Sequence, residues 1–135
     1  MIYKLNYTIG IPRTDLPQIE DEYHSDILKD MDNDNISYVN KDMGCKELKP
    51  SQDELNLEKI SGMRNEGNHL KSRSIFVSED NFIVDGHHVW AARMLDDPNM
   101  EINCYKVNMN IIDLINWFNS HDFTYSKKIT EGKNA

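Results

Sequence analysis

The residues with the clearest potential for chemistry are four consecutive ones: Asp85, Gly86, His87 and His88. They lie between a strand-like run, 82–84, and a helix-like run, 89–95. A strand that turns through glycine into a helix leaves the first amides of that helix without intrahelical partners, and these amides suit a phosphate group. A carboxylate and two imidazoles at that turn lie within reach of a bound anion. The same four residues are also compatible with a capped turn that carries two surface histidines.

A second polar box lies upstream of this turn. Pro50, Ser51 and Gln52 precede Glu54 and an amphipathic stretch, 57–64. A basic segment that contains Lys71 and Arg73 then leads into an apolar strand, 74–77. From the residues alone, Glu54 is a carboxylate before a helix start, where it stabilises the helix dipole, and the two basic residues belong to a solvated edge.

The order of these features resembles the ParB/sulfiredoxin superfamily, in which a Pro-x-Gln box precedes one helix and a glycine turn opens another. The resemblance covers roughly residues 48–107, under half of the chain. The Asp-Gly-His-His turn is most similar to the branch that includes free-serine kinases. His87 occupies the place of the sulfiredoxin cysteine.

The resemblance implies phosphoryl transfer, which needs an anion site, usually a divalent metal, and a group that takes the proton of the acceptor hydroxyl. It implies that Glu54 is the general base and that Asp85 and His87 share the catalytic site. The residues implied to bind the nucleotide or its phosphates are Gln52, Lys71, Arg73, Gly86, His87, His88 and Arg93. The implied cofactors are Mg²⁺ and a nucleotide (ATP, ADP or CTP).

One position departs from the family pattern. Where the family places an arginine that contacts nucleotide phosphates, this sequence has Val89. Arg93 lies one turn later on the same helical face, and helical side chains lean toward the amino terminus, so Arg93 could reach the turn. Alternatively, Val89 packs in the core and the phosphate contact is lost. A valine in place of Gly86 is expected to block the anion while the fold survives.

Composition and charge limit the function classes. The net charge of −8 and the pI near 5.0 argue against binding to nucleic-acid duplexes, which depends on Lys and Arg. The two cysteines have no zinc-binding or disulfide spacing, and adjacent histidines on a helix diverge by about 100°, so we expect no zinc site formed by this pair. The chain has neither a signal-peptide pattern nor a membrane-length apolar run, which predicts a cytoplasmic protein without membrane contact.

Periodicity along the chain predicts an alternation of strands and helices. The predicted strands are 3–9, 36–39, 74–77, 81–84 and 102–107, and the predicted helices are 19–31, 57–64, 87–95 and 111–119. Residues 74–84 are expected to form a hairpin, Asn56 to cap a helix, and Glu66 to Asn68 to end it. A loop with Pro12 and Pro17 and a polar connection, 40–49, complete the pattern.

These observations predict an α/β (α+β) fold with a small mixed sheet and packed helices, in one domain over residues 1–123 with a polar tail, 124–135. The predicted function is a nucleotide-binding, phosphotransferase-like activity toward a small hydroxyl-bearing acceptor. The first alternative is a noncatalytic nucleotide-binding or protein-interaction module, such as a phage or plasmid accessory protein that inhibits a host protein. The second alternative is a ParB-like DNA-binding protein or nuclease.

Overall fold

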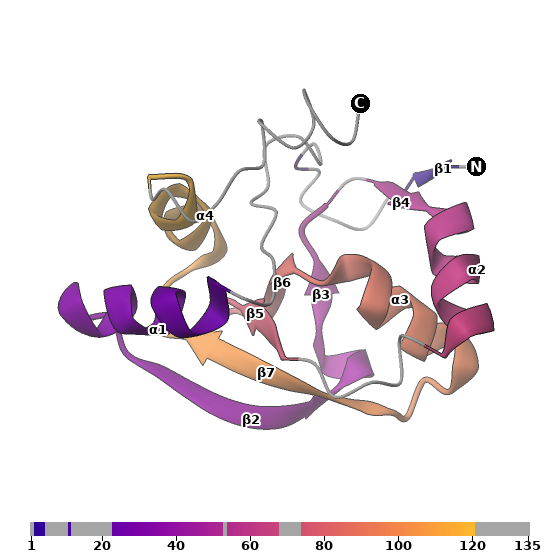
Figure 1. Ribbon diagram of the computed structural model, residues 1–135, viewed down its shortest axis with the longest axis horizontal. Coiled ribbons are helices and arrows are strands. Elements are labelled where there is room, and N and C mark those ends of the chain that lie inside the picture. The colour runs from indigo at the N-terminus through magenta and orange to yellow at the C-terminus, as the bar shows by residue number, and fades with distance from the viewer. Residues whose placement is uncertain (1, 5–10, 12–22, 53, 68–73, 121–135) are drawn as a thin grey trace.

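One five-stranded mixed sheet forms the centre of the protein (Figure 1). The computed structural model describes residues 2–4, 11, 23–52, 54–67 and 74–120. In spatial order the strands of the sheet are β2 (Tyr38–Gly44), β7 (Glu101–Val107), β5 (Ile75–Val77), β6 (Phe82–Asp85) and β3 (Lys49–Pro50). Strands β5 and β7 are parallel, as are β3 and β6, whereas β2 and β7 and β5 and β6 are antiparallel. The predicted α+β class is confirmed.

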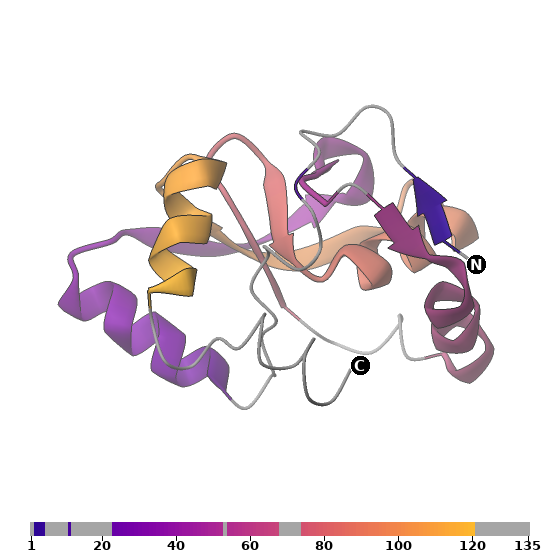
Figure 2. The ribbon, with the colours of Figure 1, turned by 90° about the horizontal axis from the view of Figure 1, so that it is seen from above.

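The helices cover opposite faces of this sheet. Helices α2 (Leu57–Glu66) and α3 (His87–Asp96) pack on the face that carries Ile75 and Cys104. Helices α1 (His24–Asn33) and α4 (Ile111–Asn119) pack on the face that carries Phe76 and Val107. Successive residues of a strand point to opposite faces, so neighbouring residues such as Ile75 and Phe76 belong to two separate apolar cores. Figure 2 shows α1 and α4 at one end of the sheet and α2 and α3 at the other.

Local signals placed several elements correctly. Strands β5 and β6 form the predicted hairpin. The Asn56 side chain accepts a hydrogen bond from the Lys59 amide at the start of α2, and Gly67 ends that helix in the left-handed conformation. Helix α4 buries its predicted apolar stripe, which consists of Ile111, Leu114, Ile115 and Phe118. In each case the signal is confined to one element or one turn.

The predicted short strand 36–39 and polar connection 40–49 were wrong. Strand β2 runs from Tyr38 to Gly44 and pairs with β7 along its whole length, and a 3-10 turn, η3 (Cys45–Glu47), follows it. Because β2 is an edge strand, the side chains from Val39 to Asp42 are exposed. Backbone pairing with β7 defines this strand. Its exposed side chains lack the apolar alternation by which a strand is predicted from sequence.

The amino-terminal elements are described only in part. Strand β1 (Ile2–Lys4) pairs with β4 (Glu54–Asn56) in a separate two-stranded sheet, and the rest of the predicted strand, 5–9, lies outside the described residues. Helix α1 begins at His24, and the predicted start of this helix at residue 19, the diproline loop and the tail 124–135 lie outside the described residues.

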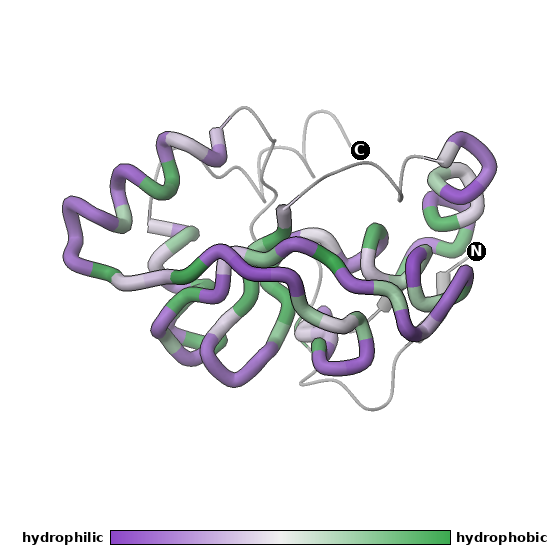
Figure 3. The backbone as a smooth tube through the Cα atoms, turned by 90° about the horizontal axis from the view of Figure 1, so that it is seen from below, coloured by the Kyte–Doolittle hydropathy of each residue, from purple (hydrophilic) through white to green (hydrophobic). Residues whose placement is uncertain are grey.

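Helix α1 shows how sparse the apolar contacts of a surface helix can be. In Figure 3 this helix is mostly purple, with green at a few positions, and its buried residues are Ile27 and Met31. Among the described helices, none combines the length and the apolar character that a membrane crossing requires.

Candidate functional site

The polar boxes singled out in the sequence meet at one edge of the sheet. Strands β3 and β6 are parallel, with Pro50 paired to Ile83, so their carboxyl ends lie at the same edge. Ser51 and Gln52 follow β3, and the turn at Gly86 follows β6. Ligands of sheets with parallel strands often bind just beyond the carboxyl ends of those strands. The fold therefore brings together two boxes that are about 35 residues apart in the sequence.

Gly86 opens α3 in a conformation that few other residues adopt. Its φ is +102°, in the left-handed region, which disfavours residues with a Cβ. A Cβ at this position would lie 2.4 Å from Cγ2 of Ile75 on β5. The expectation that valine could replace Gly86 without loss of the fold was therefore wrong. The close approach of β5 itself requires this glycine.

His87, the first residue of α3, is buried with 3% of its surface exposed. Its Nε2 accepts hydrogen bonds from the backbone amides of Ser51 at 3.0 Å and Gln52 at 3.2 Å. A backbone amide can only donate, so Nε2 of His87 carries no proton in this arrangement. The Ser51 hydroxyl, which is also buried, donates to the carbonyl of Ile83.

His88 makes an equivalent contact with a later part of the same chain segment. It is 6% exposed, and its Nε2 accepts a hydrogen bond from the Asn56 amide at 3.0 Å. Because adjacent side chains on a helix diverge by about 100°, His87 and His88 contact different parts of that segment. We call Ser51, Gln52 and β4 the tethered segment. The alternative of two surface histidines was wrong.

The structure places the other candidate residues as follows. Asp85 ends β6 and is partly buried, and Gln52 is buried. Glu54 lies in β4, which the Asn56 contact holds beside the first turn of α3. The side chain of Glu54, and Lys71 and Arg73 as a whole, lie outside the described part of the chain.

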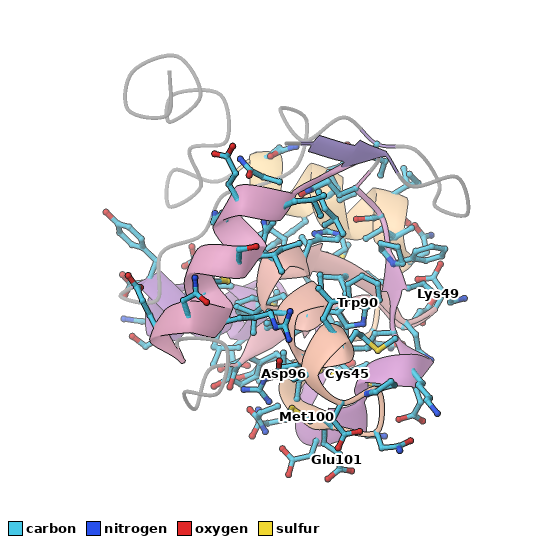
Figure 4. All side chains as sticks on the ribbon, turned by 90° about the vertical axis from the view of Figure 1, so that its right-hand side faces the viewer. Cys45, Lys49, Trp90, Asp96, Met100 and Glu101 are labelled. Atoms are coloured by element: carbon cyan, nitrogen blue, oxygen red, sulfur yellow. The ribbon has the colours of Figure 1, made fainter. Side chains whose placement is uncertain are left out.

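Of the two alternatives for Val89, the structure shows the one in which this residue packs in the core. Val89 is 3% exposed and belongs to the apolar core under α3. Nη1 of Arg93 donates to the carbonyl of Glu101 at 2.6 Å, and Glu101 begins β7 beyond the carboxyl end of α3. Figure 4 shows Met100 and Glu101 near Asp96 at this end of the helix. This contact holds the guanidinium near the end of α3 opposite Gly86.

Helices α2 and α3 have their amino ends together. The amide of Asn56, the N-cap of α2, bonds to His88 in the first turn of α3. At the other ends of the two helices, Nε of Arg64 lies 2.8 Å from Oδ1 of Asp96. The positive ends of both helix dipoles therefore lie close to the Gly86 turn.

The first turn of α3 differs from those of α2 and α4 in its capping. Asparagine side chains cap α2 and α4, through the amides of Lys59 and Asp113. The N-cap of α3 is Gly86, which has no side chain, and the first intrahelical bond runs from the amide of Trp90 to the carbonyl of Gly86. The amides of residues 87–89 precede this bond and therefore point out of the amino end of the helix.

A preformed metal site is not evident in the described part of the chain, where no three His, Cys, Asp or Glu side chains are grouped to hold an ion. A magnesium ion at this turn would come with a nucleotide, whose phosphate oxygens would be its ligands.

The sequence did not predict the hydrogen bonds by which His87 and His88 hold the tethered segment. Ser51 was interpreted only as part of the polar box and Asn56 only as a helix cap, yet their amides are the groups that the histidines hold. A signal was present, because two adjacent histidines at the start of an apolar helix place at least one of them toward the core.

A surface hollow of about 280 Å³ lies away from this edge, near the other end of the sheet. It is lined by Ser37, Tyr38, Val39, Glu79, Lys106, Val107 and Asn108. None of the candidate residues belongs to it.

No family model, curated protein or solved structure matches this chain.

Proposed function

We propose that this protein is a noncatalytic binding module that holds a phosphate group of a nucleotide at the amino end of α3. The observation that carries the proposal is the meeting of the amino ends of α2 and α3 at a turn whose N-cap, Gly86, has no side chain. Two positive helix ends attract an anion to one place, and helix amino ends are common sites of phosphate binding. This arrangement agrees with the family resemblance of the sequence.

The histidines favour binding over phosphoryl transfer. A general base needs a free lone pair that can take the proton of an acceptor hydroxyl. The Nε2 lone pairs of His87 and His88 are engaged by backbone amides. Arg93, the residue expected to contact phosphates, is bonded to Glu101 instead.

One observation favours phosphoryl transfer as the second candidate function. The bond between Asn56 and His88 holds β4 beside the first turn of α3, and Glu54 is the first residue of β4. A carboxylate on this strand would be the base for a hydroxyl acceptor. In that mechanism Mg²⁺ would neutralise charge on the transferred phosphoryl group.

Calorimetric titration with ATP, ADP, CTP and GTP, with and without Mg²⁺, tests the proposal. We expect saturable binding of at least one nucleotide, and phosphorus NMR of the same mixtures should show no turnover. Turnover that Glu54→Gln abolishes, with nucleotide affinity retained, would establish the second candidate function instead. No heat of binding with any of the four nucleotides would contradict both functions.

The variant Asp85→Asn tests direct binding of the phosphate by the amino end of α3. If the helix end holds the phosphate, removal of a nearby negative charge should leave the metal-free affinity unchanged or raise it. A loss of metal-free affinity in this variant would contradict direct binding. The matched control is Asp113→Asn, in the first turn of α4, which should leave this affinity unchanged.

A further inference from the structure

We infer that His87 and His88 form an acid-sensitive latch, which fastens the tethered segment to α3 while both imidazoles are neutral. Three backbone amides point to the two Nε2 atoms: those of Ser51, Gln52 and Asn56, at 3.0, 3.2 and 3.0 Å. Each of these bonds uses the lone pair that a proton would occupy.

Protonation of either Nε2 would place two N–H groups against each other at hydrogen-bond distance. The imidazoles are 3% and 6% exposed, so water cannot replace the lost acceptor unless the segment moves. The positive end of the α3 dipole, where both histidines lie, also disfavours an imidazolium. The latch is therefore closed while both imidazoles are neutral. An imidazolium at either position can be accommodated only when the tethered segment is released.

Other charged residues lie on the elements around the latch. Helix α3 packs against α2, β4 and η3, and the tethered segment continues from β3 opposite β6. The ionisable residues on these elements are Lys46, Glu47, Lys49, Glu54, Glu58, Lys59, Arg64, Glu66, Asp85, Arg93 and Asp96, with Asp53 between Gln52 and β4. A carboxylate near an imidazole favours its charged form, so Asp85→Asn, two residues before His87, should move the opening to lower pH.

Release of the latch would act locally. The three amides belong to the segment that leads from β3 into α2, whereas β7 pairs with β2 and β5 in the middle of the sheet. Opening would detach β4 and the start of α2 from α3, and the pairing of β7 would persist. This inference concerns the protein without a ligand and does not depend on nucleotide binding.

Hydrogen exchange measured by NMR between pH 7.5 and pH 5.5, corrected for the intrinsic pH dependence, tests the latch. Exposed histidines titrate near pH 6.5, so we expect the protection factors of the Ser51, Gln52 and Asn56 amides to fall about tenfold for each imidazole released at pH 5.5. The protection factor of the Tyr105 amide in β7 should change less than threefold. Equal changes at all four amides, or no change, would overturn the inference.

Two further measurements test the same latch. In the double variant His87→Gln and His88→Gln, the amide oxygens can accept the bonds and cannot titrate in this range, so the pH dependence should disappear, whereas His24→Gln in α1 should retain it. If the double variant does not fold, nitrogen NMR of the imidazoles in the unaltered protein remains decisive. We expect unprotonated Nε2 in both histidines at pH 7.5, and a protonated Nε2 in either would overturn the latch.

Discussion

At the scale of single residues, Gly86 is the position where the backbone allows least change. Gly86→Ala introduces a Cβ in the left-handed region and against Ile75. We expect a loss of about 2 to 4 kcal/mol in the free energy of unfolding, from backbone strain and overpacking together. Urea denaturation monitored by circular dichroism measures this loss.

The matched control is Gly62 in α2, where an added Cβ meets no atom within 4 Å. Because alanine favours a helix interior over glycine, Gly62→Ala should stabilise the protein by about 0.5 to 1 kcal/mol. Similar losses at Gly86 and Gly62 would contradict the account of the Gly86 turn.

The two cysteines lead to a prediction about reactivity and pH. Burial raises the pKa of Cys104 from 9.0 to about 12, and Cys45 and Asp42 add to this shift; burial also raises the pKa of Cys45. Only the thiolate reacts with iodoacetamide. At pH 8.5 we therefore expect Cys104 to be alkylated at least a hundredfold more slowly in the folded protein than in urea, as measured by mass spectrometry. Equal rates would show that the thiol is accessible.

The same shift has a consequence for stability. A thiol whose pKa is higher in the folded state stabilises that state fully below its unfolded pKa, near 9, and the stabilisation is lost as the pH rises toward 12. Cys104→Ala should therefore weaken the decline of stability between pH 9 and pH 11. If the decline of stability is the same in Cys104→Ala, ionisable groups other than Cys104 cause it.

At the scale of elements, the two ends of α3 have different tasks. Near the amino end, the histidines hold the tethered segment and Trp90 Nε1 donates to the carbonyl of Cys45 in η3, whereas Arg93 joins the carboxyl end to β7. Arg93→Ala should cost about 0.5 to 1.5 kcal/mol of stability and leave nucleotide affinity unchanged.

Val89→Arg tests the core position on the same helix. Because Val89 is buried, we expect a loss of more than about 2 kcal/mol and no gain in nucleotide affinity, whereas Val89→Ile should cost less than about 1.5 kcal/mol. Thermal melts and nucleotide titrations of these variants and of the pair with Arg93→Ala measure both effects. Rescue of nucleotide affinity by Val89→Arg in the Arg93→Ala background would contradict the observed placement of Arg93.

At the scale of the whole molecule, the sequence predicted what local patterns determine. The hairpin of β5 and β6, the buried stripe of α4 and the asparagine cap of α2 each depend on residues close together in the chain. The length of β2 and the tethers from His87 and His88 depend on partners about 30 to 65 residues away, and no single-segment pattern carries that information. The structure brings Gln52, Asp85, Gly86, His87 and His88 to one edge of the sheet and places Arg93 elsewhere. The contacts of the two histidines became visible only when the segment that they hold was placed.

The central claim is that a phosphate group binds the first turn of α3. Amide chemical shifts during titration with ATP test it most directly, since a bound anion shifts the amides that donate to it. The account predicts saturable shifts of the amides of His87, His88 and Val89, and no comparable shifts at residues 111–113 of α4, where Asn110 already caps the helix. Saturable shifts that leave residues 87–89 unchanged, or equal shifts at both helix starts, would contradict it.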